Sequence, residues 1–188
     1  MRLTDDRYTQ QRRRLEVALR MINHQARSAT IRECTGISED RVRKLHRTYL
    51  AQTPDAPQRK RGKSPRQVHC LTHNLQARAD AALMAGIFHS IGLVDELRRR
   101  PEGKMDTEAA ARLCDGFELF SMVRPRIQRN EFTLEHAWFL IRSLARNEVV
   151  EAATCERCAG LTLQDRYARK RLFCPLCEMK RLADAKQP

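Results

Sequence analysis

Residues 155–177 read CERCAGLTLQDRYARKRLFCPLC, and this stretch decides how the C-terminal part of the chain folds. Its four cysteines form two C-x2-C pairs, and 15 residues separate the pairs. The spacing is typical of a zinc site with four thiolate ligands, because each tight turn brings two sulfurs to one tetrahedral metal. The intervening residues suffice for a small hairpin that returns the second pair to the first. We therefore predict one Zn²⁺ per chain, with the ligands Cys155, Cys158, Cys174 and Cys177.

The predicted zinc is structural and not catalytic. Four thiolates leave no open coordination position for water or substrate, which a catalytic zinc requires. The sequence lacks the H-x-E element of zinc deaminases and the H-E-x-x-H element of metalloproteases, and it has no acidic cluster to hold Mg²⁺. We therefore expect a protein that is not an enzyme. The alternative interpretation is that the four cysteines are buried core residues that never meet.

The charge of the chain indicates its class of partner. Among 188 residues, 36 are lysine or arginine and 23 are aspartate or glutamate, which gives a formal net charge of +13. Such an excess attracts polyanions, so nucleic acid is the first candidate and a ribosomal or anionic membrane surface is the second. Hydrophobic residues make up 41% of the chain, which is enough for an apolar core.

The sequence also favours a cytoplasmic protein. It has no run of about 18 apolar residues that could span a bilayer, and its N-terminal stretch lacks the apolar region of a secretory signal. In a reducing cytosol, paired cysteines bind metal more often than they form disulfides. The odd number of cysteines, seven, also argues against a complete disulfide framework.

Apolar residues recur with a helical period over most of the chain, so the predicted fold class is mainly α. We expect helices over residues 12–26 and 68–91, and further helices that begin after the capping residues Ser38, Asp106 and Thr133. The chain is predicted to comprise N-terminal helices at 1–50, a basic proline-containing linker at 51–66, a helical body at 67–147 and a zinc-ribbon-like domain with a basic tail at 148–188.

Residues 28–49, SATIRECTGISEDRVRKLHRTY, have the layout of a helix-turn-helix: a short helix, a turn at Gly36 and a helix that Ser38 caps. The second helix of such a motif enters the DNA major groove, where its exposed side chains face base edges and phosphates. The candidate contacts on this helix are Arg41, Arg43, Lys44 and Arg47. An ordinary helical hairpin with a solvated basic face, or a surface for a partner protein, would give the same pattern.

A second basic group lies between the two cysteine pairs and comprises Arg166, Arg169, Lys170 and Arg171. A bound metal takes the place of a hydrophobic core in so small a fold, which frees its surface for charge. We expect these residues to contact phosphates. The remaining cysteines and the single tryptophan are predicted to be core residues, and the i, i+4 pair His69 and His73 is interpreted as a polar helix face.

The chain resembles the family of FlhC, the flagellar master transcriptional activator. The resemblance rests on AWFLIR at 137–142, CERCAG at 155–160, FCPLC at 173–177 and SEDRVRKLHRTY at 38–49. The family usually has two glycines after the second cysteine, where this chain has Ala159 followed by Gly160.

The resemblance implies a bacterial transcription activator subunit with a helical body and a zinc site at the four cysteines. Family members bind double-stranded promoter DNA in a hetero-oligomer with a helical partner, FlhD, and recruit RNA polymerase. We therefore expect an FlhD-like partner and promoters of flagellum biogenesis or of related genes. Two other classes remain open: a zinc-ribbon RNA- or ribosome-associated protein, and a nucleic-acid enzyme such as a nuclease whose ribbon grips its substrate.

Overall fold

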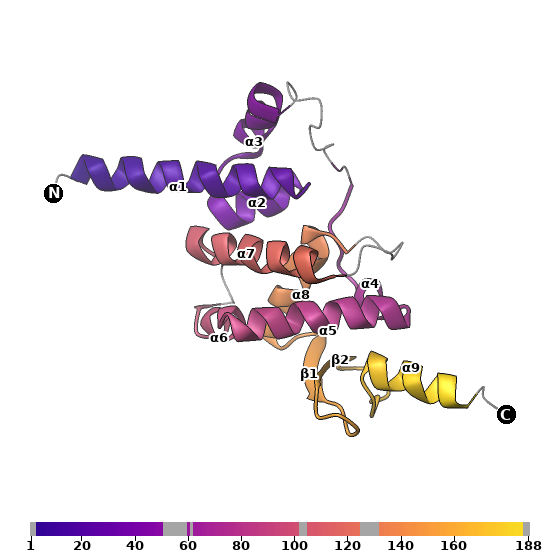
Figure 1. Ribbon diagram of the computed structural model, residues 1–188. Coiled ribbons are helices and arrows are strands. Elements are labelled where there is room, and N and C mark those ends of the chain that lie inside the picture. The colour runs from indigo at the N-terminus through magenta and orange to yellow at the C-terminus, as the bar shows by residue number, and fades with distance from the viewer. Residues whose placement is uncertain (1–2, 51–59, 61, 102–104, 125–131, 186–188) are drawn as a thin grey trace.

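The computed structural model describes residues 3–50, 60, 62–101, 105–124 and 132–185. Its elements in chain order are helices α1 (Leu3–Asn23), α2 (Ser28–Thr35) and α3 (Glu39–Leu45), the π-helical turn η1 (His46–Leu50), helices α4 (His69–Thr72), α5 (Leu75–Ser90), α6 (Leu93–Arg98), α7 (Thr107–Val123) and α8 (Leu134–Arg146), strands β1 (Val150–Thr154) and β2 (Leu161–Asp165), and helix α9 (Pro175–Asp184). The described chain is therefore mainly helical with a small two-stranded sheet, as predicted (Figure 1).

Polar side chains start several of these helices. Oδ1 of Asp106 accepts a hydrogen bond of 2.8 Å from the amide three residues ahead, and Oγ of Ser38 accepts a longer one of 3.4 Å. Both bonds satisfy amides that have no partner within the helix. Thr133 precedes α8, and its own amide donates to Nδ1 of His136 at 3.1 Å. The helix starts predicted at these three residues are confirmed.

The single helix predicted over residues 68–91 is wrong, because two helices occupy this range. α4 ends at Thr72, and Asn74 then adopts an extended backbone and accepts the amide of Ala77 at 2.7 Å to begin α5. The apolar period continues across this short interruption, so periodicity alone does not reveal it. Asn74 is a strong N-cap residue, and it is the sequence signal that marks the break.

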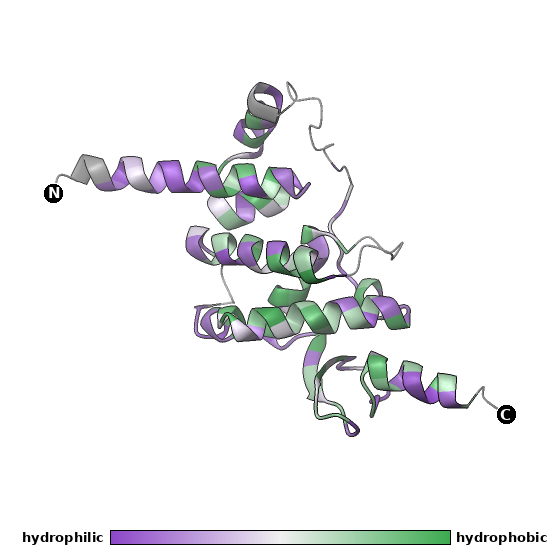
Figure 2. Ribbon diagram, viewed as in Figure 1, coloured by the Kyte–Doolittle hydropathy of each residue, from purple (hydrophilic) through white to green (hydrophobic). Residues whose placement is uncertain are grey.

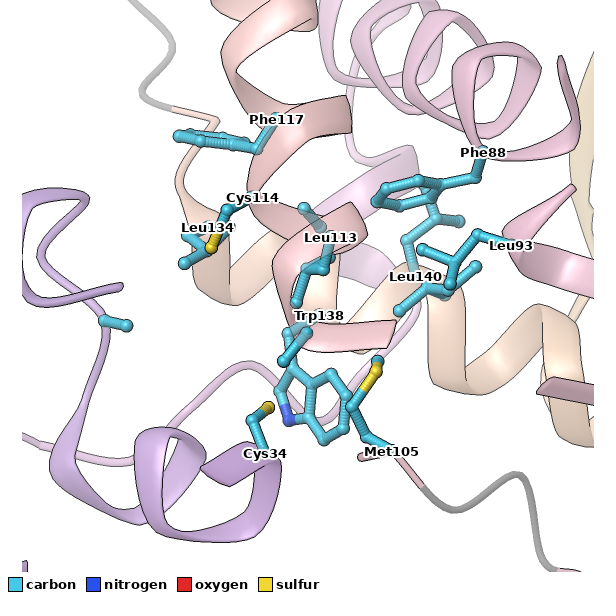
Figure 3. Packing of buried hydrophobic residues seen from close by; sticks show 14 of the residues in the cluster. Cys34, Phe88, Leu93, Met105, Leu113, Cys114, Phe117, Leu134, Trp138 and Leu140 are labelled. Carbon is cyan, nitrogen blue, oxygen red and sulfur yellow. The ribbon is translucent and has the colours of Figure 1, made fainter. Parts of the chain in front are cut away.

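The helices stack in layers around one apolar core. In Figure 1, α1 and α2 lie over α7, and α5 lies on the other side of α7. α8 packs against α5, α6 and α7. Phe88 of α5 and Leu113 of α7 are among the fully buried side chains between these layers, and Trp138 of α8 lies near Cys34 and Met105 (Figure 3). Trp138 is buried as predicted, and the buried cluster extends from Val17 to Leu163.

The N-terminal half of α1 projects beyond the stack of helices and is strongly hydrophilic (Figures 1 and 2). The C-terminal half is held against α7 by polar contacts as well as by apolar packing. Arg20 contacts Asp115 at 2.7 Å and Glu118 at 2.8 Å, and His24 lies 2.9 Å from Glu118. The contacts with α7 therefore hold the C-terminal half of α1, and the polar N-terminal half extends away from α7.

Two predictions fall partly outside the described residues. Most of the predicted linker, residues 51–59 and 61, lies there, as do residues 186–188 at the end of the predicted C-terminal domain. Among the helices that the structure describes, none combines the length and the apolarity needed to cross a membrane.

Candidate metal centre

The first cysteine pair lies in the turn of the C-terminal hairpin. β1 and β2 pair antiparallel, with Val150 opposite Asp165 and Thr154 opposite Leu161. Within the turn, the Cys155 amide donates to the Gly160 carbonyl at 3.0 Å. A side chain at Gly160 would place its Cβ 3.3 Å from Sγ of Cys158, so glycine leaves room for the sulfur at this point.

The second pair lies at the start of α9. Cys174 is the N-cap residue, Pro175 is the first helical residue, and Cys177 lies in the first turn. Proline suits this position because its fixed φ matches the helix and its missing N–H has no helical partner to lose. The helix start therefore presents both sulfurs on the side that faces the hairpin turn.

The four cysteine sulfurs converge on one point. Their Sγ atoms all lie within 4.8 Å of one another, and Sγ of Cys158 is 3.7 Å from Sγ of Cys174. A tetrahedron with zinc–sulfur bonds of about 2.3 Å has edges of about 3.8 Å, so the donor set fits a tetrahedral metal ion. Cys155, Cys174 and Cys177 are buried, and Cys158 is exposed. The interpretation of these cysteines as unconnected core residues is therefore wrong.

Backbone amides favour negative charge on this cluster. The Cys174 amide donates to Sγ of Cys155 at 3.2 Å, and the Cys177 amide donates to Sγ of Cys174 at 3.4 Å. The first of these bonds lowers the pKa of Cys155 to about 6. Burial instead raises the pKa of Cys177 to about 12. The cluster thus offers thiolate at neutral pH, and a metal ion that binds all four sulfurs displaces the remaining protons.

The helical body holds the metal centre from one side. Arg78 of α5 is almost completely buried, and its guanidinium donates to Glu178 of α9 at 2.6 Å and to the Phe173 carbonyl at 3.4 Å. β2 also packs against α5. Through these contacts, the segment that carries Cys174 and Cys177 is fixed to a rigid helix more than 90 residues earlier in the chain.

The hairpin is placed differently from the prediction. We expected it between the two cysteine pairs, but β1 precedes the first pair and the pair itself forms the turn. The sequence has three short β-prone runs. Two of them, residues 149–150 and 161–163, fall at β1 and β2 as predicted, whereas residues 172–173 are not a strand, and α9 was not predicted. Pro175 at the first helical position and the spacing of Leu176, Met179 and Ala183 are the signals that indicate this helix.

The basic residues between the cysteine pairs do not act as one group. Arg166 donates to the Asn147 carbonyl, and Arg171 lies 3.7 Å from Glu178. Arg169 and Lys170 are exposed and form no ion pair within the described chain. Of the four basic residues between the cysteine pairs, Arg169 and Lys170 are therefore the two available to bind a phosphate.

The basic residues of α3 also divide into two kinds. Arg43 lies 2.7 Å from Asp40 and 3.6 Å from Glu39, so carboxylates of its own helix neutralise it. In the part of the chain that the structure describes, Arg41, Lys44 and Arg47 are exposed and make no ion pair. The structure brings neither group of basic residues to the metal cluster itself.

The other chemically reactive side chains form no second metal site among the described residues. Cys34 and Cys114 are buried as predicted, and burial raises the pKa of Cys114 to about 12, while Cys70 is half-buried. His69 and His73 are exposed, with ring centroids 5.6 Å apart. The interpretation of the histidine pair as a polar helix face agrees with this arrangement.

Replacing Ala159 with Gly is expected to stabilise the first cysteine turn. Ala159 has a φ of +56°, a left-handed conformation that costs a residue with a Cβ about 1 kcal/mol. Glycine removes this cost, and we expect a gain of roughly 0.5 kcal/mol after its greater freedom in the unfolded chain is counted. In competition with a chelator, the Ala159→Gly variant should lose its metal more slowly than the wild-type chain. Ala153→Gly in β1 is the matched control and should weaken the hairpin; equal effects of the two substitutions would contradict the prediction.

Comparisons with known proteins identify no relative of this chain. A scan against models of protein families gives no match, and a search of curated proteins gives none either. The resemblance to the FlhC family therefore stays a prediction from the quoted residues.

Proposed function

We propose that this chain is a DNA-binding subunit of a bacterial transcription activator similar to FlhC, with structural Zn²⁺ at its four cysteines. The observation that carries the proposal is the exposed basic surface of α3 and η1, where Arg41 and Lys44 of α3 and Arg47 of η1 have no carboxylate partner in the described chain. A helix in the major groove needs such a face, because guanidinium and ammonium groups bind phosphates and the acceptors of guanine.

The surroundings of α3 support its role as the second helix of a helix-turn-helix. α2 ends at Thr35, and Gly36 takes a left-handed φ of +71° to reverse the chain before α3. Ile31 of α2 and Val42 and Leu45 of α3 are buried, so the apolar side of the pair faces the body. α3 lies at the edge of the molecule (Figure 1), where a duplex has access to it.

The metal chemistry supports zinc. Four thiolate sulfurs in a near-tetrahedral cluster suit a soft or borderline metal and not Mg²⁺ or Ca²⁺, which take oxygen ligands. A zinc ion bound by all four sulfurs would stabilise the fold. It would have no open coordination position for catalysis. The exposed Arg169 and Lys170 would then meet phosphates at a separate part of the duplex, because the hairpin and α3 lie at opposite ends of the stack of helices (Figure 1).

A protein partner is part of the proposal. Between α5 and α9 runs an apolar groove of about 610 Å³, lined among others by Leu83, Leu161, Leu176 and Met179. Leu176 is 62% exposed, which is unusual for a leucine on a helix that packs against a body. We propose that an FlhD-like helical partner covers this groove and that the resulting hetero-oligomer recruits RNA polymerase to promoters of flagellar or related genes.

The test is binding to duplexes that the wild-type chain, with its partner where one co-purifies, enriches from a randomised DNA pool. We expect Arg47→Ala to weaken binding to the enriched site by about 1–3 kcal/mol and to random duplex by much less, because a base contact is lost. Arg169→Ala should instead weaken both alike and reduce the salt slope by about one unit.

Arg43→Ala is the matched control for Arg47→Ala, since its guanidinium is neutralised within α3. If Arg47→Ala and Arg43→Ala leave binding equally unchanged, α3 does not read DNA. If RNA competes for the chain better than any duplex, the function belongs to RNA.

A further inference from the structure

The N-terminal half of α1 and the start of α3 enclose a cleft of about 540 Å³ that we call the α1–α3 cleft. Its lining comprises Arg7, Gln10, Gln11, Arg14 and Leu15 of α1 together with Gly36, Ile37, Ser38 and Arg41 at the α2–α3 turn and the start of α3. Three arginines from two separate helices therefore face one concave surface, and none of the described lining residues is acidic.

Ion pairing elsewhere leaves these three arginines free. Of the carboxylates close to them in sequence, Glu16 contacts Arg12 at 3.4 Å, Glu39 contacts Arg32 at 3.1 Å and Asp40 contacts Arg43 at 2.7 Å. Asp6, next to Arg7 in sequence, is exposed. Arg7, Arg14 and Arg41 are exposed and form no ion pair in the described chain. No carboxylate lines the α1–α3 cleft, so its positive charge has no acidic partner among the described lining residues.

A second cleft on another side of α1 provides a contrast. It has a similar volume, about 630 Å³, it shares Gln10 and Arg14 with the α1–α3 cleft, and it also contains Arg12 and Arg13. Its lining includes Glu16, Asp106 and Glu108, and Arg13 lies 3.2 Å from Glu108. Arg13 thereby joins α1 to the start of α7, whereas Arg7, Arg14 and Arg41 form no ion pair in the described chain.

We propose that the α1–α3 cleft binds the sugar–phosphate backbone of duplex DNA, on the strand that borders the groove entered by α3; this inference rests on the proposed function. Arginine suits the task because its planar fork matches two phosphate oxygens. Arg7 and Arg14 lie two helical turns apart, about 10 Å along α1, so the two guanidinium groups can bind different phosphates of one strand.

The position of Arg41 connects the cleft to the proposed reading helix. Arg41 lines the cleft and also begins the basic face that continues through Lys44 and Arg47. A strand held by Arg7 and Arg14 therefore continues directly onto α3. The side-chain amides of Gln10 and Gln11 can donate hydrogen bonds to phosphate oxygens, and these side chains are uncharged.

The experiment compares the full-length wild-type chain with Arg7→Ala/Arg14→Ala and with Arg12→Ala/Arg99→Ala. Both double variants remove two exposed positive charges, but the control removes them outside the cleft. Fluorescence anisotropy with a random-sequence duplex is measured from low to high salt. We expect the cleft variant to bind on the order of ten-fold more weakly and to lose roughly two units of salt slope, about one for each phosphate contact, while the control keeps the wild-type slope.

Arg7→Lys/Arg14→Lys keeps both charges and should restore most of the slope, and circular dichroism should show the same helix content in every variant. Equal slopes for the cleft variant and the control, with wild-type binding intact, would overturn the cleft and leave the proposed function standing. A wild-type chain that binds no duplex would overturn both. A cleft variant that loses only binding to competitor RNA would also overturn the assignment to DNA.

Discussion

Replacing Cys155 with Ser is expected to abolish metal binding and to unfold the chain from about Val149 onward, while the helices α1–α8 stay folded. Sγ of Cys155 is buried at the centre of the cluster and accepts the amide of Cys174, so this sulfur joins the two halves of the site. A serine hydroxyl is a poor zinc ligand and does not ionise at neutral pH. In small domains, structural zinc supplies an apparent folding free energy of roughly 10–16 kcal/mol.

Apart from the metal, little apolar packing holds the cysteine turn to the start of α9. The apolar cluster around the metal centre contains the three buried cysteines, with Phe173 packed against them, whereas the cluster of the body extends from Val17 to Leu163. Without metal, the turn and the start of α9 lose their common anchor. The loss should therefore be local and should leave the far-ultraviolet signal of the body largely intact.

Elemental analysis and hydrogen exchange check this prediction. The wild-type chain should carry about one metal ion and Cys155→Ser about none, and exchange should become fast in α9 but not in α5 or α8. Cys70→Ser is the control, because this half-buried thiol lies outside the cluster. Wild-type chain that is metal-free yet protected throughout α9 would refute the structural role of the metal.

The metal cluster was predictable because its information is local. Two C-x2-C pairs with a workable separation specify a common site almost without regard to the rest of the chain, and the structure brings the four sulfurs together. The capped helix starts at Ser38 and Asp106 were predictable for the same reason, since a cap and its amide are neighbours in sequence. The break at Asn74 was missed because the apolar period continued through it.

The features that depend on distant partners were not predictable. The pairing of Arg43 is an exception that the sequence does indicate, because Asp40 and Glu39 stand three and four residues before it on one helix. Arg7 and Arg14 lie among many charged residues, and only the packing of α1 beside α3 makes them one wall of a cleft whose other wall contains Arg41. Which charges a fold neutralises and which it leaves free is decided by tertiary contacts.

The contact between Arg78 and Glu178 is another feature of this kind, and it joins α5 to the start of α9. Arg78→Met is expected to destabilise the junction between α5 and α9 by about 3 kcal/mol. The guanidinium of Arg78 is 4% exposed and the carboxylate of Glu178 is 23% exposed. Loss of one member of a buried pair leaves the other charge without compensation, at a cost of about 3–5 kcal/mol, and the partial exposure of Glu178 places the effect at the lower end.

Chelator competition and hydrogen exchange separate this effect from general destabilisation. Because Arg78 also binds the Phe173 carbonyl next to Cys174, Arg78→Met should speed metal loss and exchange in α9 before it changes exchange in α8. Arg171→Met is the matched control: its contact with the same Glu178 is longer, 3.7 Å, and 55% of its side chain is exposed, so it should cost less than about 1 kcal/mol.

A double variant completes the argument. Arg78→Met/Glu178→Leu removes both charges and replaces them with apolar groups of similar length, which proteins often tolerate at little net cost. Its metal retention should therefore exceed that of Arg78→Met alone, and the non-additivity measures the coupling between α5 and the start of α9. Two outcomes would show that the buried pair does not connect the metal centre to the body. In the first, Arg78→Met loses metal no faster than Arg171→Met. In the second, adding Glu178→Leu to Arg78→Met lowers metal retention by the full cost of an independent substitution.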